Sequence, residues 1–281
     1  MIKNGTRVYF HRFGTSFDSS PTKKLSLNTL LEYNTNTNIL VPQKTILKAF
    51  YKPLLDQYPL TFMRKKKLVS IILLNWNSFE PTKNCIELIE KNTDYENYEV
   101  WVIDNGSSDG SFEKLLKNFP FIKTIKNNEN KGFAYALNQG YLNANGDYLM
   151  HVGSDVIVLN DWLTEAIKVF ESDPHIAVVG VREVTEQEAK SQILLEKIRS
   201  EPNKEKMTLP VCWITSKELI KKIGFLDAEF FSPAYGEEAD WNFRARKLGY
   251  KIIRASRSNA VHFGSAIIRK AIGKEKYILL I

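Results

Sequence analysis

The sequence is poor in cysteine and has no long apolar run. Its 281 residues include two cysteines, Cys85 and Cys212, which are far apart and outside any CxxC spacing. We therefore expect packing residues rather than a disulfide framework or a thiolate metal site. No segment is long and apolar enough to cross a bilayer, and the first residues, MIKNGTRVYFHRFGTSF, lack the apolar centre of a signal peptide. These absences predict a cytoplasmic protein.

Glycine-rich phosphate motifs and nucleic-acid motifs are also missing. The polar turn after the first strong apolar run, LLNWNSFEPTKN, has no glycine, which excludes a GxGxxG fingerprint, and there is no P-loop. The formal charge is +7, but basic residues cluster only in RKKK at 64–67 and in the tail IIRKAIGKEKYILLI. Because aromatic residues do not alternate with them, we expect no nucleic-acid partner. A solvated basic surface and a peripheral membrane contact through these two segments both stay open.

Two parts of the chain differ in composition. Residues 1–64 are rich in Asn, Thr, Ser and Lys and form a small N-terminal extension, to which the sequence assigns no role. Across residues 65–281, apolar runs such as LVSIILL, YEVWVID and DYLMHVG alternate with amphipathic segments such as PTKNCIELIEKN. This alternation is typical of βαβ units. We predict an α/β domain with a Rossmann-like mixed, mostly parallel sheet and helices on both faces.

Three polar turns begin where predicted strands stop: NWN at 75–77, DNGSSDGS at 104–111 and GSDV at 153–156. Because ligands of open α/β sheets bind beyond the carboxyl ends of the strands, we expect these turns to form one site. Asp104 lies at a strand end, where its carboxylate can accept hydrogen bonds from a nucleobase N–H or a ribose hydroxyl. Asp109 precedes the next helical segment and is predicted to cap it.

The segment GEEADWNFRARKLGY predicts a helix with an acidic first turn. Asp240 and Arg244 are four residues apart and should form an ion pair on one helical face. Glu237 and Glu238 precede them without an evident cationic partner. Adjacent carboxylates are expected to raise each other's pKa, which suits a general base.

Five motifs follow one another along the chain: VSIILLNWN, VWVIDNGSSDGS, NNENKGFAYALNQG, GDYLMHVGSDV and GEEADWNFRARKLGY. Together they resemble the family 2 glycosyltransferases with the GT-A fold, and among these the rhamnosyltransferase-like and galactofuranosyltransferase-like branch. The resemblance covers about Lys67 to Ser265 and leaves residues 1–64 outside it. It implies the GT-A arrangement for the α/β domain.

The resemblance implies a site for a nucleoside-diphosphate sugar. The first two turns would hold the base and the ribose. The start of the NKGFAYALN helix would lie near the diphosphate, where an ammonium and the positive helix end favour anions. The residues implied in donor binding are Asn75, Trp76, Asn77, Asp104, Asn105, Lys131, Gly132, Asn138, Ser154 and Asp155. An amphipathic helix with one face on the core is compatible with the same motif.

The resemblance also implies a divalent metal, Mn²⁺ or Mg²⁺. The triplet at the metal motif is Gly153-Ser154-Asp155, whose first position carries no side-chain ligand. Asp155 and, in AVHFGS, His262 would be the protein ligands, with diphosphate oxygens and waters completing the shell. A packing or surface role for His262 stays open.

The implied activity is an inverting transfer of a hexosyl or deoxyhexosyl group to a hydroxyl of a glycan or glycoconjugate. Glu238 would deprotonate that hydroxyl, and Glu237 would orient the acceptor. The alternative is a catalytically impaired relative that only binds a nucleotide-sugar or a carbohydrate, because Gly153 replaces a ligand position.

Overall fold

The computed structural model describes residues 31–34, 39–42, 66–205, 211–231 and 236–263. The chain divides into two compact units, Met1–Lys65 and Lys66–Ile281. In the first unit, β1 (Leu31–Asn34) pairs antiparallel with β2 (Ile39–Pro42). The basic tail named above lies outside the described residues. Within those residues, no helix has the length and apolar character needed to span a membrane.

The second unit is built around a nine-stranded sheet. The strands are β3 (Val69–Asn75), β4 (Tyr98–Asp104), β5 (Lys123–Lys126), β6 (Tyr148–Val152), β7 (Val156–Val158), β8 (Ile176–Val184), β9 (Lys204–Glu205), β10 (Cys212–Ser216) and β11 (Lys251–His262). The helices are α3 (Phe79–Asn92), α4 (Ser111–Asn118), α5 (Phe133–Asn143), α6 (Trp162–Ser172), α7 (Glu186–Lys190), α8 (Gln192–Ser200), α9 (Lys217–Ile223) and α10 (Glu237–Lys247).

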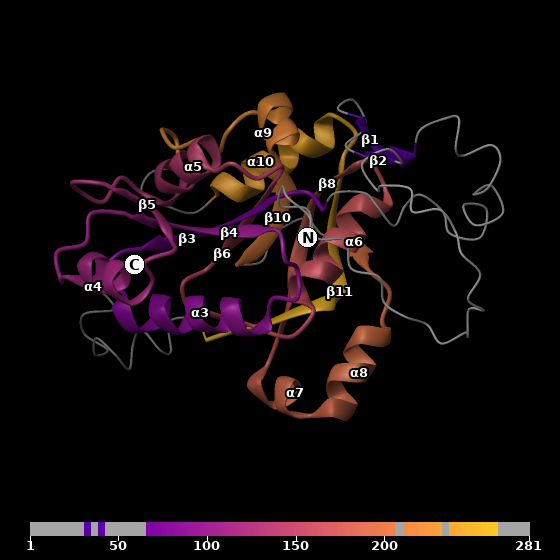
Figure 1. Ribbon diagram of the computed structural model, residues 1–281, viewed down its shortest axis with the longest axis horizontal. Coiled ribbons are helices and arrows are strands. Elements are labelled where there is room, and N and C mark those ends of the chain that lie inside the picture. Colours follow the sequence, from indigo (N-terminus) through magenta and orange to yellow (C-terminus); the bar gives the residue numbers. More distant parts are fainter. Residues whose placement is uncertain (1–30, 35–38, 43–65, 206–210, 232–235, 264–281) are drawn as a thin grey trace, which may run out of the picture. The chain divides into compact units, whose positions relative to one another are not determined.

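The sheet is mixed, and most of its strands run in one direction. Their order is β5-β4-β3-β6-β10-β8-β11-β7, and β9 pairs with β11. The parallel pairs are β3 with β4 and β6, β4 with β5, and β8 with β11, whereas β7, β9 and β10 run antiparallel to their neighbours. Helices α5, α9 and α10 lie on one side of the sheet, and α3 and α4 lie on the other (Figure 1). The predicted α/β fold is therefore confirmed.

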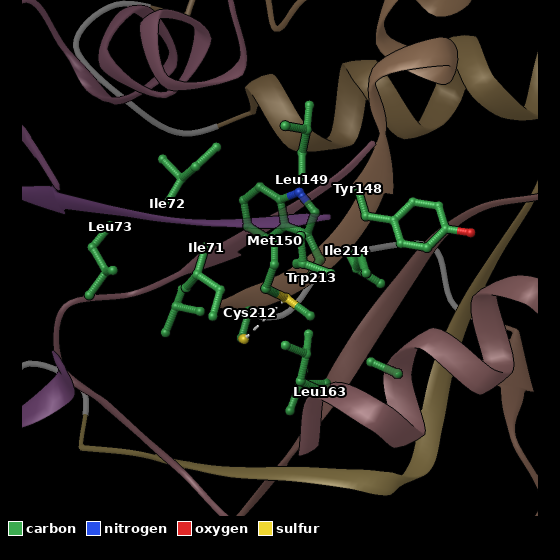
Figure 2. Close-up of a cluster of buried hydrophobic side chains, with 14 of the residues drawn as sticks. Ile71, Ile72, Leu73, Tyr148, Leu149, Met150, Leu163, Cys212, Trp213 and Ile214 are labelled. Atoms are coloured by element: carbon green, nitrogen blue, oxygen red, sulfur yellow. Dashed lines mark hydrogen bonds between the residues drawn. The ribbon is translucent and has the colours of Figure 1, made fainter. Parts of the chain in front are cut away.

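The hydrophobic core lies between the sheet and the helices on its two faces. Every residue of β3 except Leu74 is buried, because a strand with helices on both faces has no solvated side. Ile71 of β3 is in register with Met150 of β6. The sulfur atoms of Met150 and Cys212 lie 4.0 Å apart within the same apolar cluster (Figure 2). Cys212 and Cys85 are both buried and free, as expected of packing residues.

The predicted polar turns reach one edge of the sheet. Asn75 and Asp104 are in register at the carboxyl ends of β3 and β4. The neighbouring strand β6 ends at Val152 on the same side. β11 ends at His262, which pairs with Val156 at the start of β7. The turn after β6 and the end of β11 thus meet near the carboxyl ends of β3 and β4, where an open α/β sheet places its ligand site.

Candidate active site

Asp104 is fully buried at the end of β4. Its Oδ1 accepts hydrogen bonds from Asn75 Nδ2 at 2.7 Å and from Ser107 Oγ at 2.6 Å, and its Oδ2 accepts one from the Ser107 backbone N–H at 3.0 Å. Asn75 Nδ2 also donates to Ser111 Oγ at 2.9 Å, and its Oδ1 accepts from Thr82 Oγ1 at 3.0 Å. Both polar side chains therefore tie the first two turns together. Their contact with a ligand stays a prediction.

Residues of the NWN turn continue this network at the surface. Asn77 lies in the left-handed region, with φ of 49°, and its Oδ1 accepts a hydrogen bond from the Ser108 backbone N–H at 2.9 Å. Trp76 beside it is 39% exposed, so part of this large aromatic residue is accessible to a ligand. Asp109 accepts a hydrogen bond at 2.9 Å from the N–H of Ser111, the first residue of α4. The N-cap residue of α4 is Gly110, which has no side-chain capping bond, so Asp109 contacts the helix start from one residue earlier and is not its cap.

The loop before α5 is fastened to Asn105. Asn105 Oδ1 accepts hydrogen bonds from the Lys131 backbone N–H and from Asn127 Nδ2, each at 3.0 Å. Lys131 Nζ forms an exposed ion pair with Glu129 at 2.5 Å. Gly132 is the N-cap of α5 and has φ of 85°, a conformation that glycine adopts without a Cβ clash. The loop thus holds the helix start that was predicted to lie near a diphosphate.

The segment between α9 and α10 is anchored from two helices. Asn138 of α5 exchanges two hydrogen bonds with the backbone of Leu226, at 2.8 and 3.1 Å. Asp240 and Arg244 form the predicted ion pair at 2.8 Å, and Arg244 also donates to the Ile223 carbonyl at 2.8 Å. The Asn138 amide thus positions the chain around Leu226, which lies between α9 and α10. Its predicted contact with the donor remains a prediction.

An open cleft of about 310 Å³ lies at the carboxyl edge of the sheet. Its lining residues are Leu74, Phe133, His151, Gly153, Ser154, Asp155, Val211, Trp213 and Glu238. Of the predicted site residues, it brings together Ser154, Asp155 and Glu238. Asn75, Asp104, Lys131 and Asn138 are not among its lining. A carboxylate from the turn after β6 and one from the start of α10 therefore face one hollow.

Asp155 forms an ion pair with His262 from the end of β11. Asp155 Oδ2 lies 3.2 Å from His262 Nε2, and Glu183 Oε2 lies 3.7 Å from His262 Nδ1. The hydrogen bonds with Asp155 and then Glu183 raise the pKa of His262 to about 10, so the ring is protonated at neutral pH. The predicted pairing of Asp155 with His262 in space is present, and Glu183 is an added partner.

The Asp155–His262 pair has the spacing of two metal ligands. Two adjacent ligands of an octahedral ion, each about 2.1 Å from the metal, lie about 3 Å apart. The observed 3.2 Å between Asp155 Oδ2 and His262 Nε2 fits that distance. A metal would take the place of the imidazole proton, because only the neutral ring can coordinate. Within the described residues, no group of three or more His, Cys, Asp or Glu side chains is arranged to hold an ion, so substrate oxygens would have to complete the shell.

Glu238 sits in the first turn of α10 and lines the cleft. Burial raises its pKa above the ordinary value of 4.5. Glu237 is 1% exposed and belongs to the packed side of the helix. We expected the two adjacent carboxylates to raise each other's pKa. The structure instead gives desolvation as the main cause for Glu238, because its side chain lies in a partly closed cleft.

Several residues in or beside the cleft were not predicted from the sequence, among them Phe133, His151, Trp213 and Glu183. Phe133 and His151 occupy core-like positions within two of the motifs, Trp213 lies in a short apolar run, and Glu183 lies near the end of β8 without a motif. Their roles depend on strand pairing: Trp213 is opposite His151 in the β10–β6 pair, and Glu183 is opposite Ala260 in the β8–β11 pair. No local sequence signal reports those pairings.

Solved structures share this fold. A mannosyltransferase of Pyrobaculum calidifontis, PcManGT, in complex with GDP-Man and Mn²⁺, aligns with a TM-score of 0.56 and 19% identity over 70% of this chain and 57% of that chain. GalNAc-T7 with UDP, GalNAc and Mn²⁺ aligns with a TM-score of 0.57 and 14% identity over 70% of this chain and 44% of that chain. The shared α/β sheet places this chain among proteins with a GT-A-like fold.

The sequence comparisons place the chain in a family within this class. It belongs to glycosyl transferase family 2, whose family model matches residues 70–272. An uncharacterized glycosyltransferase of Bacillus subtilis, YfnE, is 35% identical over 175 residues, which are 57% of this chain and 42% of the relative. The chain thus spans about two fifths of the length of that curated relative.

Proposed function

We propose that this chain transfers a sugar from a nucleoside-diphosphate sugar to a hydroxyl of a glycan or glycoconjugate, with inversion at the anomeric carbon. The observation that carries the proposal is the cleft itself, in which Asp155 and the half-buried Glu238 face one hollow. A single displacement needs a base on one side of the sugar and a site for the leaving diphosphate on the other.

Glu238 is the proposed base. Its carboxylate removes the proton from the acceptor hydroxyl as the acceptor oxygen forms a bond to the anomeric carbon. The bond from that carbon to the diphosphate breaks at the same time, and the electron pair leaves with the nucleoside diphosphate. A raised pKa suits this role, because it brings the proton affinity of the carboxylate closer to neutral pH. Glu237 is proposed to orient the acceptor indirectly, through the start of α10.

Asp155 and His262 are the proposed holders of Mn²⁺ or Mg²⁺. When bound, such an ion would neutralise negative charge on the diphosphate. The two solved neighbours named above contain Mn²⁺, which supports this assignment. Ser154 lies beside Asp155 in the cleft and offers a hydroxyl to the same ligand.

The two tied turns and the start of α5 are proposed to bind the nucleotide. Trp76 and the outer side of the turn at 104–111 would contact the base and ribose. Lys131 and the N-terminus of α5 would lie near the diphosphate, where positive charge is favoured. The finer proposal for the transferred sugar is a hexosyl or deoxyhexosyl group, in line with the rhamnosyltransferase-like and galactofuranosyltransferase-like branch.

A donor screen tests the proposal. The protein is incubated with UDP-, GDP- and dTDP-sugars, with MnCl₂ or with EDTA, and release of the nucleoside diphosphate is measured. Glu238→Gln should lower that release by about two to four orders of magnitude and leave nucleotide affinity nearly unchanged. The matched control is Glu96→Gln, because the Glu96 side chain is 87% exposed and lies before β4, away from the cleft.

Each result of the screen has a meaning. Metal-dependent release that Glu238→Gln abolishes and Glu96→Gln preserves would support transfer. Donor binding without any release by the unaltered protein would favour the alternative of a binding relative. Loss of donor binding in Glu238→Gln would refute the assignment of Glu238 as base.

A further inference from the structure

His151 lines the same cleft as the proposed metal ligand Asp155 and the proposed base Glu238. It is close enough to Asp155 for that carboxylate to influence its pKa. On the other side, its ring centroid is 4.4 Å from that of Trp213. Trp213 Nε1 donates a hydrogen bond to Tyr141 Oη at 3.1 Å. The charge of Glu238 contributes to raising the pKa of Tyr141. His151 and Trp213 therefore form adjoining parts of the wall of this cleft.

The imidazole of His151 has hydrogen-bonding capacity that the protein does not use. The residue is 3% exposed, and its Nδ1 is buried with no partner of hydrogen-bond geometry. Burial lowers its pKa to about 3, against the smaller opposite effects of a hydrogen bond with the Ile72 backbone and of the Asp155 charge. The ring is therefore neutral, with one donor and one acceptor nitrogen, and Nδ1 is the nitrogen left without a partner of good geometry. A buried polar group left unpaired destabilises a site, so such a group is informative when it lines a cleft.

Aromatic neighbours hold this ring in place. Phe133 packs edge-on against His151 with ring centroids 5.3 Å apart and an interplanar angle of 84°, and Trp213 is tilted at 53° on the other side. Trp213 is itself held in place by its hydrogen bond to Tyr141. A rigid wall with mostly apolar surface and one polar group is typical of a small-molecule site, where the polar group sets orientation.

We propose that His151 hydrogen-bonds a ring hydroxyl of the sugar in the nucleotide donor and thereby selects among sugars. This inference rests on the proposed function, because it places the sugar between the diphosphate side at Asp155 and the base Glu238. A hydroxyl both donates and accepts, so it satisfies a neutral imidazole in either tautomer. A sugar that lacks or inverts this hydroxyl leaves the imidazole unpaired and binds less well.

The test compares His151→Phe, which keeps a ring of similar size without nitrogen, with His151→Gln, which keeps hydrogen-bonding groups. The dissociation constants of UDP-glucose, UDP-galactose, UDP-N-acetylglucosamine, GDP-mannose and dTDP-rhamnose are measured with MnCl₂, together with those of UDP, GDP and dTDP. The quantity of interest is the affinity of the best donor relative to its own nucleoside diphosphate. His175→Gln is the matched control, because the His175 side chain is 70% exposed.

We expect His151→Phe to lower that relative affinity about tenfold, the ratio associated with one hydrogen bond to an uncharged partner. Nucleoside diphosphate affinity should be unchanged, preference between epimeric donors should shrink, and His151→Gln should stay within about threefold of the unaltered protein. An unchanged ratio in His151→Phe, or an equal loss for donor and diphosphate, would overturn the role of His151 and leave the proposed function intact. If the unaltered protein binds no nucleotide-sugar and releases no diphosphate, both proposals fail.

Discussion

Two glycines in the turn at 104–111 provide a test of how the proposed nucleotide side of the site is built. Gly106 has φ of 81°, and a Cβ on it would lie 2.3 Å from the Glu129 carbonyl carbon and 2.8 Å from the Asn130 nitrogen. Gly110 has φ of 76°, but a Cβ there would meet nothing within 4 Å. The two positions share a left-handed backbone and differ in the space beside them.

The expected costs differ accordingly. Gly110→Ala should lower the free energy of unfolding by about 1 kcal/mol, because alanine is strained at positive φ. Gly106→Ala has the same strain and also forces two backbone segments apart, which adds about 2 kcal/mol of overpacking. For a domain of this size, that added cost corresponds to about 6 °C in the melting temperature.

Urea unfolding of the two variants measures this difference. Gly106→Ala should also weaken nucleotide binding more than Gly110→Ala does, because the displaced backbone leads directly into Lys131 and Gly132. Equal stabilities of the two variants would refute the reasoning, since the close approach of the turn to residues 129–130 would then not exist in solution.

Three further predictions concern charged groups. Because burial raises the pKa of Glu238 above 4.5, turnover should fall as the pH decreases through a midpoint above that value, and Glu238→Gln should raise the melting temperature at pH 8 but not at pH 4. Burial raises the pKa of Glu99, but hydrogen bonds from Lys123 and other donors outweigh it and lower the pKa to about 2. Its stabilising effect is complete above the unfolded pKa and disappears as the pH falls towards 2, so Glu99→Gln should cost about 2 kcal/mol at pH 7 and little at pH 2 in urea unfolding. Asp155→Asn should weaken Mn²⁺ binding, measured by calorimetry with GDP present, by at least about tenfold, and unchanged binding would exclude Asp155 as a ligand.

Local patterns were enough to predict most of the secondary structure that positions the site. The apolar runs around Ile71 and Met150 indicated buried strands, and the four-residue spacing of Asp240 and Arg244 indicated their ion pair. These features depend on neighbours a few residues apart or on strand period, so a single sequence reports them directly. The position of Glu238 in the first turn of a helix was predictable for the same reason.

The use of individual side chains was less predictable. The ligand contact predicted for Asp104 stays a prediction, and the sequence did not indicate that its oxygens also accept hydrogen bonds from Asn75 and Ser107. Those internal contacts depend on which donors the adjacent strand and turn bring within reach. For Glu238, likewise, the raised pKa comes from burial in the cleft, which only the tertiary structure forms.

The sequence by itself determined the alternation of strands and helices, the polar turns at the strand ends and the identity of the two cleft carboxylates. Tertiary structure alone decided which groups meet. Asp155 and His262 are 107 residues apart and lie within 3.2 Å only because β11 returns beside β7. His151 faces Trp213 because β10 runs antiparallel to β6. Contacts of this kind arise from strand order and direction, which the packing of the whole sheet selects and no short stretch of sequence encodes.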